Sequence, residues 1–131
     1  TYVSGLDETL RYITVTDGKP GASEIVDDGT SVDGRAFSDG KHIVGDDSTI
    51  RTEGDVVTIY YADSSSLGLR RAVGTANTPT SHRWDLRSVK GEDRWMAFPQ
   101  FVPGEDKVAV WWRQSTRATK SVEGDVTVIA P

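Results

Sequence analysis

The sequence predicts an all-β protein, and three observations support this prediction. Thirteen glycines, five prolines and many Asp-Gly and Ser-rich steps divide the chain into short segments. The segments between these breaks are rich in Val, Ile, Thr, Tyr and Trp, which suit a pleated surface. Signals of helices are almost absent along the chain.

Ten segments, taken in order, have the length and composition of β-strands, and residues 1–4 fit the end of one more. Several of them are continuous apolar runs instead of clean alternations, which indicates sheets covered on both faces. The expected strands are 10–16, 22–27, 48–52, 56–62, 67–73, 83–89, 97–102, 107–113, 117–121 and 125–129.

Composition and charge restrict the possible functions. The 131 residues have the length of one domain, and the net charge of −5 without a basic stripe argues against a nucleic-acid partner. No segment approaches the roughly 18 apolar residues of a membrane span. The absence of cysteine excludes disulfides and thiolate metal sites. The chain starts at Thr1 without an apolar signal segment, which fits a trimmed chain or processing from a larger precursor.

Two internal alignments indicate a repeat. Residues 54–64 align without a gap with residues 105–115, an offset of 51 that places Tyr60 on Trp111 and Tyr61 on Trp112. At an offset of 59, residues 2–13 align with residues 61–72. This second alignment places Tyr2 on Tyr61, Leu10 on Leu69 and Arg11 on Arg70.

A period of about fifty residues with about four short strands is typical of a propeller blade. The sequence therefore predicts a partial β-propeller of about two and three-quarter blades, as a single all-β segment over residues 1–131. The blades are an incomplete one at 1–43, which lacks its first strand, and two more at 44–92 and 93–131. The alternative is one antiparallel β-sandwich of about ten strands, which needs no partner.

The stretch "VGDDSTIRTEGDVVTIYYADSSSLGLRRA" resembles the sialidase-like β-propeller repeats of bacterial secreted and surface proteins. The matching residues are Gly45, Ser48, Gly54, Tyr61, Asp63, Leu69 and Ala72. This resemblance implies a propeller fold and a secreted or cell-envelope location. Residues 27–43 depart from the pattern as an insertion, and no Ser-x-Asp-x-Gly-x-x-Trp box is present, so the resemblance implies no catalysis.

An arc of under three blades leaves its two end faces uncovered, whereas closed propellers have about four to eight blades. We therefore expect another polypeptide chain, or further copies of this one, to complete the ring. The first interpretation of function is a binding or assembly segment of a larger secreted or cell-envelope protein. The alternatives are a carbohydrate-binding lectin subunit that forms an oligomeric ring, and a fragment of a propeller glycosidase. No residue spacing demands catalysis.

Candidate site residues are few. Aromatic rings with arginines are typical of sugar binding, and the candidates for contact with a glycan are Trp95, Arg94, Arg70 and Tyr61. The long loop at 27–43 is the expected binding surface. Carboxylates among glycines there could hold calcium, with a solvated loop as the alternative; the candidate ligands are Asp33, Asp39, Asp46 and Asp47. No other cofactor is expected. His42 and His82 are expected to be surface or loop histidines.

Overall fold

The computed structural model describes residues 1–78, 80–89, 95–116 and 121–130, and these residues form β-strands and no helix. The all-β prediction is therefore confirmed. No described segment forms a helix that could span a membrane. The strands are β1 (Tyr2–Ser4), β2 (Thr9–Thr16), β3 (Lys19–Asp27), β4 (Ser31–Val32), β5 (Arg35–Ala36), β6 (Val44–Glu53), β7 (Val56–Asp63), β8 (Gly68–Thr78), β9 (Ser81–Val89), β10 (Trp95–Phe101), β11 (Val108–Thr116) and β12 (Ser121–Ile129).

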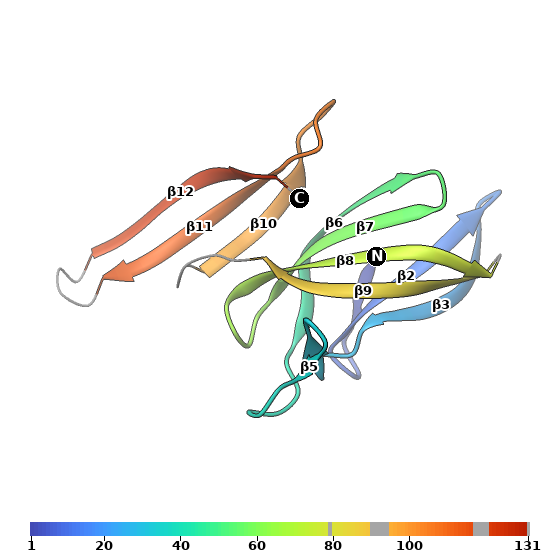
Figure 1. Ribbon diagram of the computed structural model, residues 1–131, viewed down its shortest axis with the longest axis horizontal. Coiled ribbons are helices and arrows are strands. Elements are labelled where there is room, and N and C mark those ends of the chain that lie inside the picture. Colours follow the sequence, from blue (N-terminus) through green and yellow to red (C-terminus); the bar gives the residue numbers. More distant parts are fainter. Residues whose placement is uncertain (79, 90–94, 117–120, 131) are drawn as a thin grey trace.

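The described strands form four antiparallel sheets, in which each strand pairs with its neighbour in sequence. The N-terminal sheet is β1-β2-β3, the central sheet is β6-β7-β8-β9 and the C-terminal sheet is β10-β11-β12. Strands β4 and β5 form a small separate hairpin. Figure 1 shows the central sheet between the other two, with the C-terminal sheet projecting from one side. None of these sheets closes on itself into a barrel.

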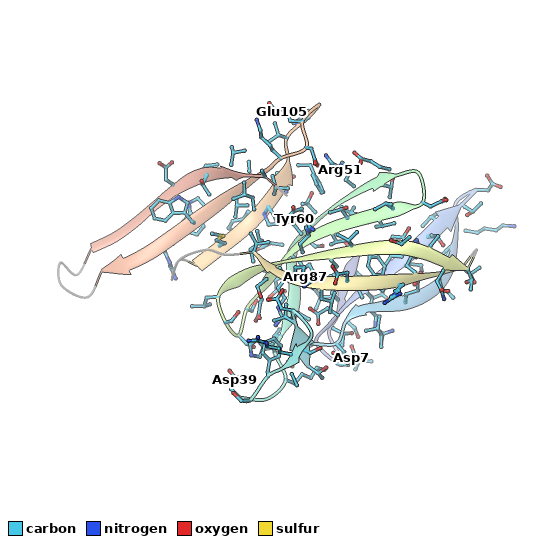
Figure 2. All side chains as sticks on the ribbon, in the orientation of Figure 1. Asp7, Asp39, Arg51, Tyr60, Arg87 and Glu105 are labelled. Atoms are coloured by element: carbon cyan, nitrogen blue, oxygen red, sulfur yellow. The ribbon has the colours of Figure 1, made fainter. Side chains whose placement is uncertain are left out.

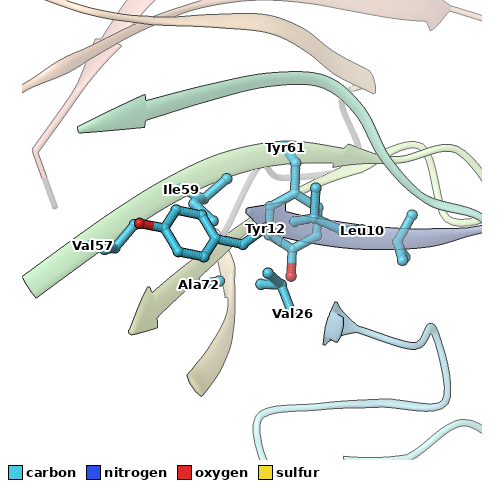
Figure 3. Packing of buried hydrophobic residues seen from close by; sticks show 8 residues of the cluster. Leu10, Tyr12, Val26, Val57, Ile59, Tyr61 and Ala72 are labelled. Atoms are coloured by element: carbon cyan, nitrogen blue, oxygen red, sulfur yellow. The ribbon is translucent and has the colours of Figure 1, made fainter. Parts of the chain in front are cut away.

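One core lies between the N-terminal and central sheets (Figure 3). Strand β7 supplies alternate residues to it, because successive side chains of a strand point to opposite faces. Trp84 and Leu86 of β9 pack against its edge. The fully or nearly buried members of this core are Leu10, Tyr12, Val26, Val44, Val57, Ile59, Tyr61 and Ala72.

A second core lies between the central and C-terminal sheets, where β10 packs against β6, β7 and β8. Tyr60 and Leu69 face this core from the central sheet, and Met96, Val108 and Val110 face it from the C-terminal sheet. Strand β7 is thus covered on both faces, which explains why its sequence is a continuous apolar run.

The C-terminal sheet differs in part from the prediction. Of the strand expected at 117–121, residues 117–120 lie outside the described residues. The strand expected at 125–129 begins earlier, since β12 pairs with β11 from Ser121 to Ile129, and the described residues give this sheet three strands. Gly124 lies inside β12, where an added Cβ would lie 3.2 Å from the ring of Trp111. A strand glycine of this kind marks a close approach by another group.

The insertion at 27–43 is also more ordered than expected. It contains the hairpin β4-β5, whose turn residues Asp33 and Gly34 have φ angles of 52° and 71°. Asp-Gly with two positive φ angles suits a tight hairpin turn. The insertion is anchored at its base, where the amide of His42 donates to the carbonyl of Gly29 at 2.8 Å.

Candidate functional site

A buried ionic cluster joins the N-terminal and central sheets. Arg70 on β8 donates from Nη1 to Asp27 Oδ2 at 2.7 Å and from Nε to Asp63 Oδ2 at 3.0 Å. Asp27 ends β3 in one sheet, and Asp63 ends β7 in the other. All three side chains are at most 3% exposed. An unpaired buried charge is very costly, so these three groups depend on one another.

Tyr61 and His42 complete the cluster. The hydroxyl of Tyr61 donates to Asp27 Oδ2 at 2.7 Å. The imidazole of His42 lies with Nδ1 2.8 Å from Asp63 Oδ2 and with Nε2 3.2 Å from Asp39 Oδ1. The two ring nitrogens of His42 are therefore held between two carboxylates.

Phe37, from the insertion, covers this cluster. Its ring is stacked on the ring of His42, with centroids 3.7 Å apart and planes 9° apart. The guanidinium carbon of Arg70 lies 4.7 Å from the centroid of the same ring, which is a cation–π contact. Phe37 and His42 of the insertion therefore cover the ionic cluster, while most of the other residues of the insertion are exposed.

The cluster shifts the pKa values of its members. Burial lowers the pKa of His42, but its hydrogen bonds to Asp63 and Asp39 outweigh burial, and the net shift is upward from 6.5. Burial raises the pKa of Asp63, but the hydrogen bonds from His42 and Ser66 and the charge of Arg70 lower it below 3.8 overall. Burial, followed by the charge of Asp27, raises the pKa of Tyr61 well above its usual value.

The raised pKa of His42 predicts a pH-dependent stability. Protonated His42 stabilises the folded state fully below its unfolded pKa of 6.5, and this contribution is lost as the pH rises through the higher folded pKa. The free energy of unfolding should therefore fall as the pH rises above about 6.5, and the fall should be smaller in His42→Gln. Urea denaturation at a series of pH values measures this slope. Equal slopes for the two proteins would contradict the assignment.

The residues predicted to bind a glycan are placed differently from one another. Arg70 and Tyr61 are buried in the ionic cluster, so a ligand could reach them only if the cover formed by Phe37 and His42 moved. Arg94 lies outside the described residues, and so does the side chain of Trp95, which begins β10. Glycan binding by these residues stays a prediction.

The four aspartates predicted to hold calcium do not form one cluster, although Asp46 and Asp47 are neighbours. Asp33 accepts from the hydroxyl of Ser88 at 2.5 Å, and Asp39 contacts His42. Asp46 accepts from the hydroxyl of Ser64, and burial, with the nearby charge of Asp46, raises the pKa of Asp47. Within the described part of the chain, no group of three or more such side chains could hold a metal ion.

The roles of His42, Asp27 and Asp63 in this cluster were not predicted from the sequence. His42 is 6% exposed instead of lying on the surface, because it fills the space between Asp63 and the ring of Phe37. Asp27 ends a predicted strand, and its role as the partner of Arg70 depends on a contact across 43 positions. The run from Asp63 to Ser66 could have indicated a structural role for Asp63, because Asp and Ser favour turns. In the structure, Asp63 Oδ1 accepts the amides of Ser65 and Ser66 at 3.0 Å.

The N-terminal sheet has an uncovered apolar face on the side away from the central sheet, which we call the N-terminal outer face. Its members are Tyr2, Arg11, Ile13 and Ile25, which alternate with the buried residues of β2 and β3. Ile25 is 48% exposed and Tyr2 is 42% exposed. The Nε of Arg11 is buried without a hydrogen-bond partner among the described residues, although Nη2 pairs with Asp7 at 2.7 Å.

The C-terminal sheet has a corresponding C-terminal outer face. Its members are Phe98, Trp111, Val126 and Val128, and the rings of Phe98 and Trp111 lie 6.2 Å apart. Phe98, Val126 and Val128 are each more than half exposed. The opposite face of this sheet carries Val110, which is fully buried against the central sheet.

Comparisons with protein-family models, with curated proteins and with solved structures found no significant match to this chain. The features of this chain that bear most on its function are its two uncovered sheet faces.

Proposed function

We propose that this chain is an assembly segment of a propeller-like stack of β-sheets, in which further sheets of the same kind cover both of its outer faces. These further sheets come from other copies of the chain or from another polypeptide. The observation that carries the proposal is that each outer face repeats a face of the central sheet that is already buried.

The first comparison concerns the N-terminal outer face. Tyr2 lies directly opposite Arg11 in the pairing of β1 with β2, as Tyr61 lies opposite Arg70 in the pairing of β7 with β8. Tyr61 and Arg70 are covered by the N-terminal sheet, and Arg70 receives a carboxylate from it. Tyr2 and Arg11 occupy the corresponding positions in the N-terminal sheet, but they lie on the N-terminal outer face, which none of the described sheets covers. A preceding sheet would supply the missing contacts, including a partner for the buried Nε of Arg11.

The second comparison concerns the C-terminal outer face. Tyr60 and Trp111 both lie on the second strand of their sheets, at the offset of 51. Tyr60 is buried by the sheet that follows it, whereas Trp111 faces the side that none of the described sheets covers. One residue earlier, Ile59 and Val110 are both fully buried against the preceding sheet. The central sheet therefore stacks on the N-terminal sheet in the same direction as the C-terminal sheet stacks on the central sheet.

The strand count favours the same conclusion. The central sheet has four strands, the N-terminal sheet begins with the strand that corresponds to β7, and the C-terminal sheet has three described strands. Strands β1 and β12 are open edges, and exposed edges pair readily with other chains. Covering an apolar face of several hundred Å² stabilises by roughly 25 cal/mol per Å². Two such interfaces can offset the roughly 4–15 kcal/mol cost of association.

Sedimentation velocity with two matched variants tests this proposal. The purified chain should sediment as a species larger than its 14.3 kDa monomer at micromolar concentrations. Ile25→Asp and Val126→Asp each place a charge on one outer face and should abolish this association. Val56→Asp, at an exposed position of the β6-β7 hairpin, is the control and should associate as the wild type does.

Mixing the two variants gives a second test. If the N-terminal outer face of one copy packs on the C-terminal outer face of the next, Ile25→Asp and Val126→Asp together retain one intact interface. The mixture should then form heterodimers that neither variant forms alone. A folded, monodisperse wild-type monomer with cooperative unfolding would contradict the proposal and would favour a self-sufficient β-sandwich. The lectin, glycosidase and secretion interpretations stay predictions.

A further inference from the structure

A row of three polar side chains crosses the central sheet on the face that points toward the C-terminal sheet. Tyr60 of β7 lies directly opposite Arg71 of β8, and Arg71 lies directly opposite Arg87 of β9. Residues that are directly opposite in antiparallel strands share one face of the sheet. Figure 2 marks Tyr60 at the junction of the two sheets and Arg87 farther out on the central sheet.

Tyr60 presents a hydroxyl without a partner. Its side chain is 1% exposed, yet the hydroxyl oxygen makes no hydrogen bond to any described residue. Buried hydroxyl groups are normally hydrogen-bonded, because leaving one unpaired forfeits the bonds it made to water. An unpaired hydroxyl of this kind points to a ligand that completes its bonding.

The guanidinium of Arg71 also has a nitrogen without a hydrogen-bond partner. Its Nε is buried without a hydrogen-bond partner, and the residue forms no ion pair with a carboxylate in the described part of the chain. By contrast, Arg87 pairs with Asp85 through Nε at 3.0 Å, and Arg51 pairs with Asp106 and Glu53. Two like charges directly opposite in a sheet destabilise it, and Arg71 and Arg87 are such a pair. An anion between them would remove this repulsion.

The space beside these residues is large enough for a small group. Two hollows between the central and C-terminal sheets share Tyr60 and Arg71 as lining residues. One of about 170 Å³ extends toward Arg51 and Phe101, and one of about 260 Å³ extends toward Arg87 and Ser88. Both are smaller than the roughly 300–1,000 Å³ of pockets for drug-sized ligands. The size suits one acidic group.

We propose that Tyr60, Arg71 and Arg87 bind an oxyanion in the hollow between the central and C-terminal sheets. The anionic group is a carboxylate, a sulfate or a phosphate, either free or as part of a larger acidic molecule. The hydroxyl of Tyr60 donates one hydrogen bond, and the guanidinium of Arg71 supplies the directional, charge-assisted bonds that recognise planar or tetrahedral oxyanions. The site lies within one chain, so it does not depend on the proposed assembly.

Sodium acetate, sodium sulfate and sodium phosphate are the probes, each titrated against sodium chloride at matched ionic strength. Chemical shifts of the arginine Nε–H groups in ¹H–¹⁵N NMR spectra report binding at the residue. We expect saturable shifts of the Arg71 signal with at least one probe. Saturation by acetate alone assigns a carboxylate, and saturation by sulfate or phosphate assigns a tetrahedral anion.

Three variants locate the site. Arg71→Gln should weaken binding about tenfold or more, and Tyr60→Phe, which keeps the packing of the ring, should weaken it several-fold. Arg35→Gln removes the same charge from the exposed β4-β5 hairpin and should bind as the wild type does. If Arg71→Gln fails to fold, Tyr60→Phe still decides the question.

Two results would overturn the proposal. The first is the absence of saturable binding by all three probes in the folded wild-type chain. The second is equal binding by the wild type, Tyr60→Phe and Arg35→Gln, because this would place the anion elsewhere on the protein.

Discussion

Replacing Arg70 with methionine should destabilise the folded chain by about 3–5 kcal/mol, which is the usual cost of removing one partner from a buried ion pair. The substitution keeps an unbranched apolar chain of similar length but removes the guanidinium. Asp27 and Asp63 would then remain buried without the guanidinium between them, and only His42 beside Asp63 could still supply a positive charge. Tyr61 would retain its bond to Asp27, but one neutral hydroxyl cannot compensate for the lost charge.

Urea denaturation followed by far-UV circular dichroism measures this loss, and Arg71→Met is the matched control. Arg71 is the next residue on β8, and its side chain points to the opposite face of the sheet. Replacing it with methionine removes the same charge. It has no ion pair in the described structure, so its replacement should change the unfolding free energy by less than about 1 kcal/mol. Comparable losses for the two variants would show that the ionic cluster does not hold the sheets together.

The strands of the central sheet were predictable because their local and long-range signals agree. Residues 56–62 were expected as a strand and β7 spans Val56–Asp63, since both of its faces are buried and nearly every residue is a good strand former. The same composition identified residues 107–113, and β11 spans Val108–Thr116, although only one face of β11 is buried against the central sheet. Where burial on both faces requires apolar β-formers throughout, composition alone identifies the strand.

Glycine was the main source of error in the strand boundaries. Gly74 lies within β8 opposite Trp84, and Gly124 lies within β12 close to the ring of Trp111. An added Cβ at Gly74 would lie 2.5 Å from the ring of Trp84, so this glycine exists to admit the indole. A single sequence does not distinguish a glycine that turns the chain from one that accommodates a neighbouring ring.

The site could be predicted only in part, for a similar reason. Arg70 and Tyr61 were identified as chemically important from their residue types, but a guanidinium beside an aromatic ring fits both a sugar site and a buried ion pair. The distinction depends on Asp27, which is 43 positions from Arg70, and on the cover formed by Phe37. Such contacts are fixed by how the sheets stack, which local sequence patterns do not encode.

Gly29→Ala, at the base of the insertion that carries Phe37, should also lower the free energy of unfolding strongly. Gly29 has a φ angle of 77°, and an added Cβ would lie 2.0 Å from the carbonyl oxygen of His42. The left-handed backbone costs about 1–2 kcal/mol for alanine. The clash with backbone atoms adds about 1–3 kcal/mol, because the chain must shift to relieve it. We therefore expect a loss of about 2–5 kcal/mol in unfolding free energy.

Gly34→Ala separates the two causes. Gly34 has a similar φ angle of 71°, but an added Cβ there meets nothing within 4 Å, so only the backbone cost of about 1–2 kcal/mol applies. The displacement at Gly29 should also move His42 away from Asp63, because the two backbones are joined at the base of the insertion. Gly29→Ala should consequently lose much of the pH dependence above about pH 6.5, whereas Gly34→Ala should keep it. Equal destabilisation and equal pH profiles in the two variants would mean that the insertion does not hold His42 in place.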